Sequence, residues 1–147
     1  MPRKKVKRSL KKNMDTNCRC ASIDSCIILR ILIRDIPEQA KKVRDLFLSG
    51  ADFYVDDAAI METVHVMTKQ KYTREEITDG LLGLLRNSMF IYDRNFYSPV
   101  FEMYLKHPSL SFDDCILARR AELKGCIPLW TFDRKLANQS AVARRLA

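Results

Sequence analysis

Short apolar runs alternate with helix-length segments along this chain, and no other feature limits its possible folds as strongly. The runs have the length of β-strands and lie at residues 21–23, 53–55, 89–92 and 127–132. The segments between them place apolar residues at helical spacing. Strands separated by helices are typical of a parallel sheet. The pattern therefore predicts an α/β fold, with a parallel sheet of four to five strands flanked by helices on both faces.

Helix start and stop signals support this alternation. Pro37 can open a helix in its first turn, and Gly50 is placed to end that helix. Thr73, with a glutamate three residues later, has the spacing of a capping box. Ser111 precedes two acids that favour a helix N-terminus, and Gly125 is placed to stop the helix that follows.

Positive charge is concentrated at the start of the chain, whose net charge is +8. Residues 1–20 hold eight basic residues and one acid, which leaves 18 basic and 17 acidic residues in 21–147. We expect 1–20 to be a disordered basic tail and 21–147 to be the folded domain. Such a tail attracts polyphosphate backbones without reading sequence. In the alternative interpretation, Met14 is the true initiator and the tail has no function.

Several classes of protein are disfavoured by composition. The apolar runs are too short to span a bilayer, and the basic start leads into polar residues instead of the apolar stretch of a signal peptide. The five cysteines show no CxxC pair, and no Cys/His pair completes a zinc finger. We therefore expect a cytoplasmic protein with reduced thiols, no structural zinc and no membrane partner.

Four acids fall where parallel sheets carry their functional crevice, outside the carboxyl ends of the strands. Asp24 follows the first predicted strand and Asp133 follows the last. Glu62 lies in the helix after the second strand, and Asp114 lies in the first turn of the helix before the last strand. Asp15 is an alternative to Asp24, but no apolar strand precedes it to hold its carboxylate in place.

Crowded carboxylates repel one another unless a cation lies between them. Carboxylates without His or Cys favour Mg²⁺ or Mn²⁺ over zinc. Such a cation lowers the pKa of a bound water, and the hydroxide formed can attack a phosphodiester. A metal site built by Asp24, Glu62, Asp114 and Asp133 would therefore suit phosphodiester hydrolysis.

Four stretches in order resemble the PIN-domain ribonucleases, in particular VapC-type toxins of bacterial toxin–antitoxin pairs. The stretches are SIDSCIILRIL, VDDAAIMETVHVM, LSFDDCILARRAELKG and IPLWTFDRKL, and the resemblance covers about residues 21–140. It implies a PIN-like nuclease domain whose catalytic and metal-binding acids are Asp24, Glu62, Asp114 and Asp133. It also implies an RNA substrate, a homodimer, and a small antitoxin whose tail fills the acidic groove.

The chain departs from the family at the residues after the first acid. The family's usual Asp-Thr-Asn is replaced by Asp24-Ser25-Cys26. Ser25 can still donate a hydrogen bond, whereas Cys26 is a poor substitute for an amide. Asp113 and Thr131 are further candidates for supporting residues.

Arg134 and Lys135 follow the last acid and are candidates for contacts to the RNA backbone, with an ordinary solvated helix start as the alternative. The predicted function is a metal-dependent endoribonuclease that acts as the toxin of a type II toxin–antitoxin system. The main alternative is a nucleic-acid-binding PIN-like module with a degenerate catalytic site. A phosphoryl-accepting receiver domain is disfavoured because it needs an early acid pair and a late lysine after a strand.

Other residues have mainly structural interpretations. Glu62 and His65 have the spacing of a di-iron helix, but a second such pair is missing. We expect Trp130 to lie in the core. Five aromatic residues can either stack on bases or pack between helix and sheet, and packing is the favoured interpretation: Tyr54, Phe96, Tyr97, Phe101 and Tyr104.

Overall fold

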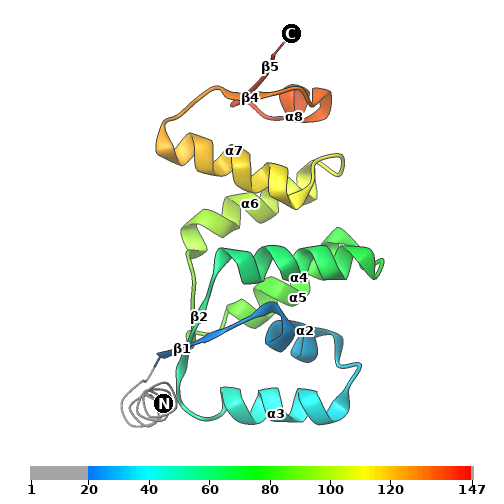
Figure 1. The fold of residues 1–147 in the computed structure, drawn as a ribbon, viewed down its shortest axis with the longest axis vertical. Helices are drawn as coiled ribbons and strands as arrows, with labels where there is room; N and C mark the ends of the chain where they lie inside the picture. Colours follow the sequence, from blue (N-terminus) through cyan, green and yellow to red (C-terminus); the bar gives the residue numbers. More distant parts are fainter. Residues whose placement is uncertain (1–19, 147) are drawn as a thin grey trace, which may run out of the picture.

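The structure is a computed structural model that describes residues 20–146. Strands and helices alternate as the sequence predicts (Figure 1). The strands are β1 (Cys20–Ile23), β2 (Asp52–Val55), β3 (Phe90–Ile91), β4 (Leu129–Thr131) and β5 (Ala143–Arg145). The helices are α2 (Ser25–Ile33), α3 (Pro37–Phe47), α4 (Asp57–Lys69), α5 (Arg74–Leu85), α6 (Arg94–Lys106), α7 (Phe112–Lys124) and α8 (Arg134–Gln139). Residues 1–19 of the predicted disordered tail lie outside this range. Cys20, the last residue of that tail, begins β1.

The predicted helix signals are confirmed with one exception, because Leu48 and not Gly50 caps the C-terminus of α3. Pro37 is the first residue of α3, and Thr73 forms a complete capping box with Glu76 at the start of α5. Gly125 ends α7 with a φ of +65°, a left-handed conformation that glycine adopts without steric cost. Gly50 lies beyond the end of α3, where its φ of +85° serves the turn into β2. A helix start at Arg134 and Lys135 was the alternative to RNA contacts, and α8 begins there, whereas strand β5 was not predicted.

Strands β1, β2 and β3 form one parallel sheet in that order. Ile23 pairs with Val55, and Phe53 pairs with Phe90. All four of these side chains are buried, and Phe47 of α3 packs on both phenylalanine rings. One face of this sheet therefore lies against the helices.

The opposite face of this sheet is exposed, which corrects the prediction of helices on both faces. Ser22, Tyr54 and Ile91 lie on this face, and the latter two are 42% and 45% exposed. A parallel sheet normally has both faces covered because each crossover lays a helix on one of them. In the described residues, α6 and α7 do not take up that position.

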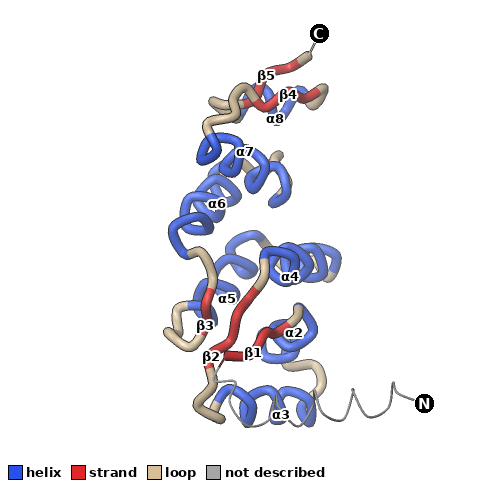
Figure 2. Tube along the Cα trace, turned by 60° about the vertical axis from the view of Figure 1, so that its left-hand side comes forward, coloured by secondary structure: helices blue, strands red, loops and turns tan. Residues whose placement is uncertain are grey.

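Strands β4 and β5 form a separate two-stranded parallel sheet. The prediction of one sheet with four to five strands is therefore wrong for this chain. Figures 1 and 2 show the two sheets toward opposite ends of the long axis, with α6 and α7 between them. Predicted as a core residue, Trp130 lies on β4 with 55% of its surface exposed.

Contacts between distant helices explain this separation. Arg120 of α7 pairs with Asp57 of α4 at 2.9 Å. At the start of α5, Arg74 donates hydrogen bonds to the carbonyl oxygens of Tyr104 and Leu110, at 2.8 and 2.6 Å. These contacts hold α6 and α7 against α4 and α5, and the chain therefore leaves α7 away from β1.

Packing, rather than base stacking, is the role of four of the five aromatic candidates. Phe96, Tyr97, Phe101 and Tyr104 are each at most 2% exposed on α6, and only Tyr54 is accessible. No helix among residues 20–146 is both long enough and apolar enough to cross a membrane.

Candidate functional site

Asp24 lies at the junction between β1 and α2. Its side chain caps α2 by accepting hydrogen bonds from the backbone N–H groups of Cys26 and Ile27, at 2.9 and 3.4 Å. Both bonds end on the same oxygen, Oδ1, so Oδ2 remains available for another partner. Cys26 contributes its backbone here while its side chain is exposed. The replacement of the family's amide therefore leaves this cap intact.

Asp133 repeats this arrangement at the junction between β4 and α8. Its Oδ1 accepts hydrogen bonds from the backbone N–H groups of Lys135 and Leu136, at 2.7 and 3.1 Å. Thr131 Oγ1 accepts the backbone N–H of Asp133 at 2.9 Å. The side chains of Arg134 and Lys135 are exposed in the first turn of α8.

Asp114 and Asp113 have different partners at the start of α7. Asp114 forms a capping box with Ser111, in which its Oδ2 accepts the backbone N–H of Ser111 at 3.2 Å. Asp113 instead contacts His65 of α4, with 2.9 Å between Oδ1 and Nε2. The two neighbouring acids therefore have different structural roles. Asp114 caps its own helix, and Asp113 connects that helix to α4.

Glu62 lies exposed on α4, and His65 connects it to α7. The distance from Glu62 Oε2 to His65 Nδ1 is 3.9 Å, and the other ring nitrogen of His65 contacts Asp113. His65 thus brings an acid of α4 and an acid of α7 to the two sides of one ring. Sequence reasoning missed this role, although the Glu-x-x-His spacing placed both side chains on one helix face.

A second connection between α4 and the C-terminal helices was also missed. Asp57 accepts a hydrogen bond from the hydroxyl of Tyr97 at 2.5 Å and pairs with Arg120. Burial, followed by the hydrogen bond to Asp57, raises the pKa of Tyr97 above its usual value. Tyr97 is therefore a neutral donor at physiological pH, and this cluster is structural.

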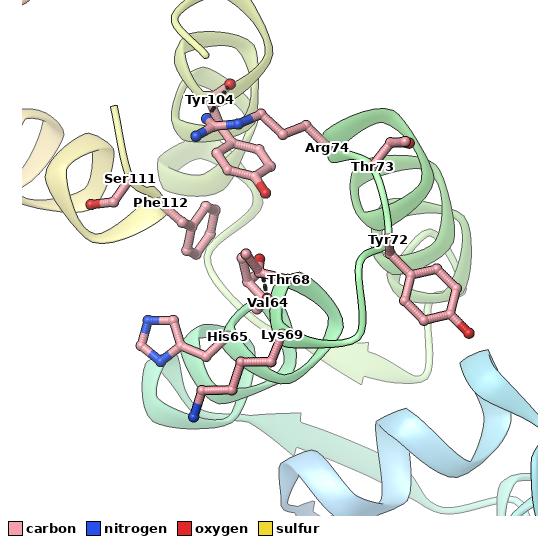
Figure 3. Close-up of a pocket in the computed structure, with 10 residues that line it drawn as sticks. All are labelled: Val64, His65, Thr68, Lys69, Tyr72, Thr73, Arg74, Tyr104, Ser111 and Phe112. Atoms are coloured by element: carbon pink, nitrogen blue, oxygen red, sulfur yellow. Dashed lines mark hydrogen bonds between the residues drawn. The ribbon is translucent and has the colours of Figure 1, made fainter. Parts of the chain in front are cut away.

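A cavity of about 520 Å³ lies beside His65, between α4, the start of α5 and the facing ends of α6 and α7 (Figure 3). Arg74 spans it with its guanidinium group 4.2 Å from the centre of the Tyr104 ring. Of the four candidate acids, none lines this cavity. The cavity is therefore lined by apolar and basic side chains, and the four candidate acids do not form it.

The four candidate acids do not gather within one chain. Glu62 approaches Asp113 through His65, whereas Asp24 and Asp133 follow strands of different sheets. Within residues 20–146, no three His, Cys, Asp or Glu side chains lie close enough together to hold a metal ion. The arrangement in a single chain therefore does not fit the predicted metal site.

Comparison with protein families matches residues 21–142 to the PIN domain. The match covers most of β1 and all of β2, β3 and β4, ends before β5, and includes all four candidate acids. No curated protein matches the chain.

Proposed function

The chain belongs to the PIN domain family, and we propose that it is a metal-dependent endoribonuclease that hydrolyses RNA phosphodiester bonds. The PIN domain is a nuclease-type fold, and its members are generally hydrolases that typically use divalent metal ions. RNA as substrate, cleavage inside the strand, and Mg²⁺ or Mn²⁺ as cofactor are our narrower proposals.

The observation that carries the proposal is the family match over all four candidate acids. Asp24 and Asp133 each follow a parallel strand and cap the next helix, with Oδ2 uninvolved in the cap. Glu62 and Asp114 stand on helices that His65 and Asp113 link. We propose these four acids as the catalytic and metal-binding residues, with Ser25, Asp113 and Thr131 in support.

The residues around Asp133 have specific roles in this proposal. Thr131 orients the backbone of Asp133, and the cap of α8 holds its carboxylate at the strand end. Arg134 and Lys135 extend from the same turn into solvent, where their charges can contact backbone phosphate. A divalent cation would activate water for attack on phosphorus. Within residues 20–146, the acids of one chain do not form a site for that cation.

Cleavage of structured RNA by the purified protein tests the proposal. We expect cutting with Mg²⁺ or Mn²⁺, loss of cutting with a chelator, and loss in Asp24→Asn and Asp133→Asn. Asparagine caps a helix about as well as aspartate, so these variants remove charge without removing the cap. Asp79→Asn, on the exposed side of α5, is the matched control. Cutting that survives chelation or the Asp24 substitution would contradict the metal mechanism.

The toxin role is a narrower proposal that depends on the resemblance to VapC-type proteins. We propose a cytoplasmic homodimer inhibited by a small antitoxin whose tail fills the acidic groove. Expression of the wild-type chain in a bacterial host should arrest growth, and expression of the Asp24→Asn variant should not. Growth arrest by both chains would separate toxicity from nuclease activity.

The separation of the acids favours one alternative, a nucleic-acid-binding module with a degenerate catalytic site. Cys26 in place of the family's amide supports the same alternative. Calorimetric titration with Mn²⁺ distinguishes the two functions. A nuclease should release heat that disappears in Asp24→Asn and Asp133→Asn, whereas a degenerate module should show no heat that depends on these acids.

A further inference from the structure

The cavity between α4, the start of α5 and the facing ends of α6 and α7 has the size of a small-molecule site. Its volume of about 520 Å³ lies within the range of about 300–1,000 Å³ that is typical of ligand pockets. The buried side chains of Val64, Tyr104 and Phe112 form its floor, and the exposed residues Thr68 and Lys69 lie on its rim. Such a floor suits the flat body of an organic ligand.

Two positive charges that line this cavity are not balanced by an acid in its lining. Arg74 donates to the carbonyl oxygens of Tyr104 and Leu110, which are neutral groups. The side chain of Lys69 has no hydrogen bond or ion pair with any residue of 20–146. His65 differs, because it already contacts two acids. Since no aspartate or glutamate of the described chain lines the cavity, it favours a ligand with negative charge.

Polar groups in the cavity favour a ligand body that can form hydrogen bonds. Thr68 donates its hydroxyl hydrogen to the carbonyl oxygen of Val64 at 2.7 Å, so the hydroxyl oxygen can still accept a bond from a ligand. Figure 3 shows the Tyr104 hydroxyl turned toward the turn of α4 that carries Thr68. Burial raises the pKa of Tyr104, which therefore stays protonated and can donate. A hydrocarbon would cover these groups without replacing their bonds to water, whereas the polar edge of a nucleobase can replace them.

We infer that this cavity binds one nucleotide unit, with the base against its floor and the phosphate at Lys69. The ammonium group of Lys69 is a compact charge that suits a phosphate, and the guanidinium group of Arg74 adds a second positive charge nearby. Thr68 and Tyr104 supply an acceptor and a donor for the edge of the base. A free mononucleotide and an unpaired nucleotide of an RNA chain share this chemistry.

RNA as the source of the nucleotide rests on the proposed nuclease function. His65 lines the cavity and lies 3.9 Å from Glu62. Ser111 also lines it, and its hydroxyl accepts the backbone N–H of Asp114 at 3.1 Å. A base in the cavity would therefore bring the RNA backbone to the side of the molecule where these two acids lie. Only an unpaired base can enter such a pocket, so the cavity would select loops and single strands.

Calorimetry of the full chain with AMP, GMP, CMP and UMP tests the site. We expect at least one mononucleotide to bind more tightly than its nucleoside and than inorganic phosphate, because each of these carries only part of the recognised group. Lys69→Gln should weaken this binding by about tenfold or more, since a contact to a charged group is lost. Thr68→Tyr should abolish it by filling the cavity.

Lys106→Gln is the matched control, because it removes an exposed lysine at the end of α6 that does not line the cavity. This variant should bind mononucleotides like the wild type. Lys69 and Thr68 are exposed positions of α4, and urea denaturation checks that their variants remain folded. The inference is overturned by a wild type that binds none of the four mononucleotides, by phosphate that binds as tightly as they do, or by equal losses in Lys69→Gln and Lys106→Gln.

Fluorescence anisotropy with labelled RNA separates the two sources of the nucleotide. The Asp24→Asn chain with a chelator keeps the RNA intact during the measurement. If RNA supplies the nucleotide, Thr68→Tyr should weaken the binding of a single strand and leave that of a duplex of the same sequence unchanged. Single-strand binding that Thr68→Tyr does not alter would overturn the RNA source and assign the cavity to free nucleotides. An inactive wild type would refute the nuclease proposal, while these binding measurements would still decide the occupant of the cavity.

Discussion

At the scale of single residues, the candidate acids serve the fold as well as the proposed chemistry. Asp24 and Asp133 each use one carboxylate oxygen to cap a helix, an interaction worth about 1 kcal/mol. Capping also limits the orientations of the side chain, which favours any ligand role of the second oxygen. Asp114 and Asp113 show that adjacent acids can take different partners within one helical turn.

Among the acids that do not cap a helix, we predict that Asp57 contributes most to the free energy of unfolding. Asp57→Ala removes the acceptor of the buried Tyr97 hydroxyl and the partner of Arg120. We expect the free energy of unfolding to fall by about 1–3 kcal/mol, measured by urea denaturation. Asp79→Ala, at an exposed position of α5, should change it by less than about 0.5 kcal/mol. Equal effects of the two substitutions would contradict the structural role of Asp57.

Three buried groups predict sensitivity to alkaline pH. Burial raises the pKa of the Cys115 thiol from an ordinary 9.0 to about 11, and it also raises the pKa of Tyr97 and of Tyr104. In the unfolded chain all three groups lose their protons at lower pH than in the folded chain. The free energy of unfolding should therefore fall as the pH rises from 9.0 toward about 11.

Urea denaturation at a series of pH values across this range checks the prediction. Cys115→Ala removes one of the three groups and should make the decline shallower. A stability that stays constant over the range, or a decline unaffected by this substitution, would show that the buried thiol is not its source.

At the scale of elements, helix starts carry most of the identifiable site residues. The caps of α2, α7 and α8 involve Asp24, Asp114 and Asp133, and each satisfies backbone N–H groups that would otherwise lack partners. Each acid is therefore positioned by hydrogen bonds within its own helix start. These bonds do not depend on how the strands pair. How the elements assemble is decided by other contacts.

The capping box of α7 gives a prediction at this scale. Ser111→Ala removes the hydroxyl that accepts the backbone N–H of Asp114. We expect a loss of about 1 kcal/mol in the free energy of unfolding and faster hydrogen exchange at the Asp114 amide. Ser49→Ala, in the exposed turn after α3, is the control and should leave both quantities unchanged. Unaltered exchange in Ser111→Ala would argue against the capping box.

At the scale of the whole molecule, charge and topology are unevenly distributed. Residues 21–147 are almost neutral, and the excess positive charge belongs to residues 1–20. The contacts of His65 with Asp113 and of Asp57 with Arg120 hold α7 against α4, and the two sheets of the described residues remain separate.

Removal of residues 1–13 tests the role of the basic tail in RNA binding. These residues carry seven lysines and arginines and no acid. A chain that starts at Met14 should bind RNA more weakly, and the slope of log affinity against log salt should become shallower by up to about 5. Fluorescence anisotropy with labelled single-stranded RNA, in the Asp24→Asn background, measures both quantities.

A full-length control with the same seven residues changed to glutamine should behave like the truncated chain, because only charge is removed. Equal salt slopes for the intact and truncated chains would assign RNA binding to the folded domain.

Most elements of this fold are readable from the sequence because their causes are local. Apolar spacing, Pro37, the Thr73 capping box and Gly125 each act within a few residues, and the structure confirms the elements that they predict. The positions of Asp24 and Asp133 after strands were predictable for the same reason. The exposure of Trp130 was not, because it depends on which other parts of the chain cover β4.

The arrangement of the sheets was decided by contacts between residues far apart in the chain. The pairs Asp57–Arg120 and His65–Asp113 join positions 63 and 48 residues apart, and neither leaves a periodic signal in the sequence. Local interactions set which segments become strands and helices. Which of these segments pair depends on contacts between side chains that are far apart in the chain. The local sequence pattern therefore could not show that β4 lies away from β1.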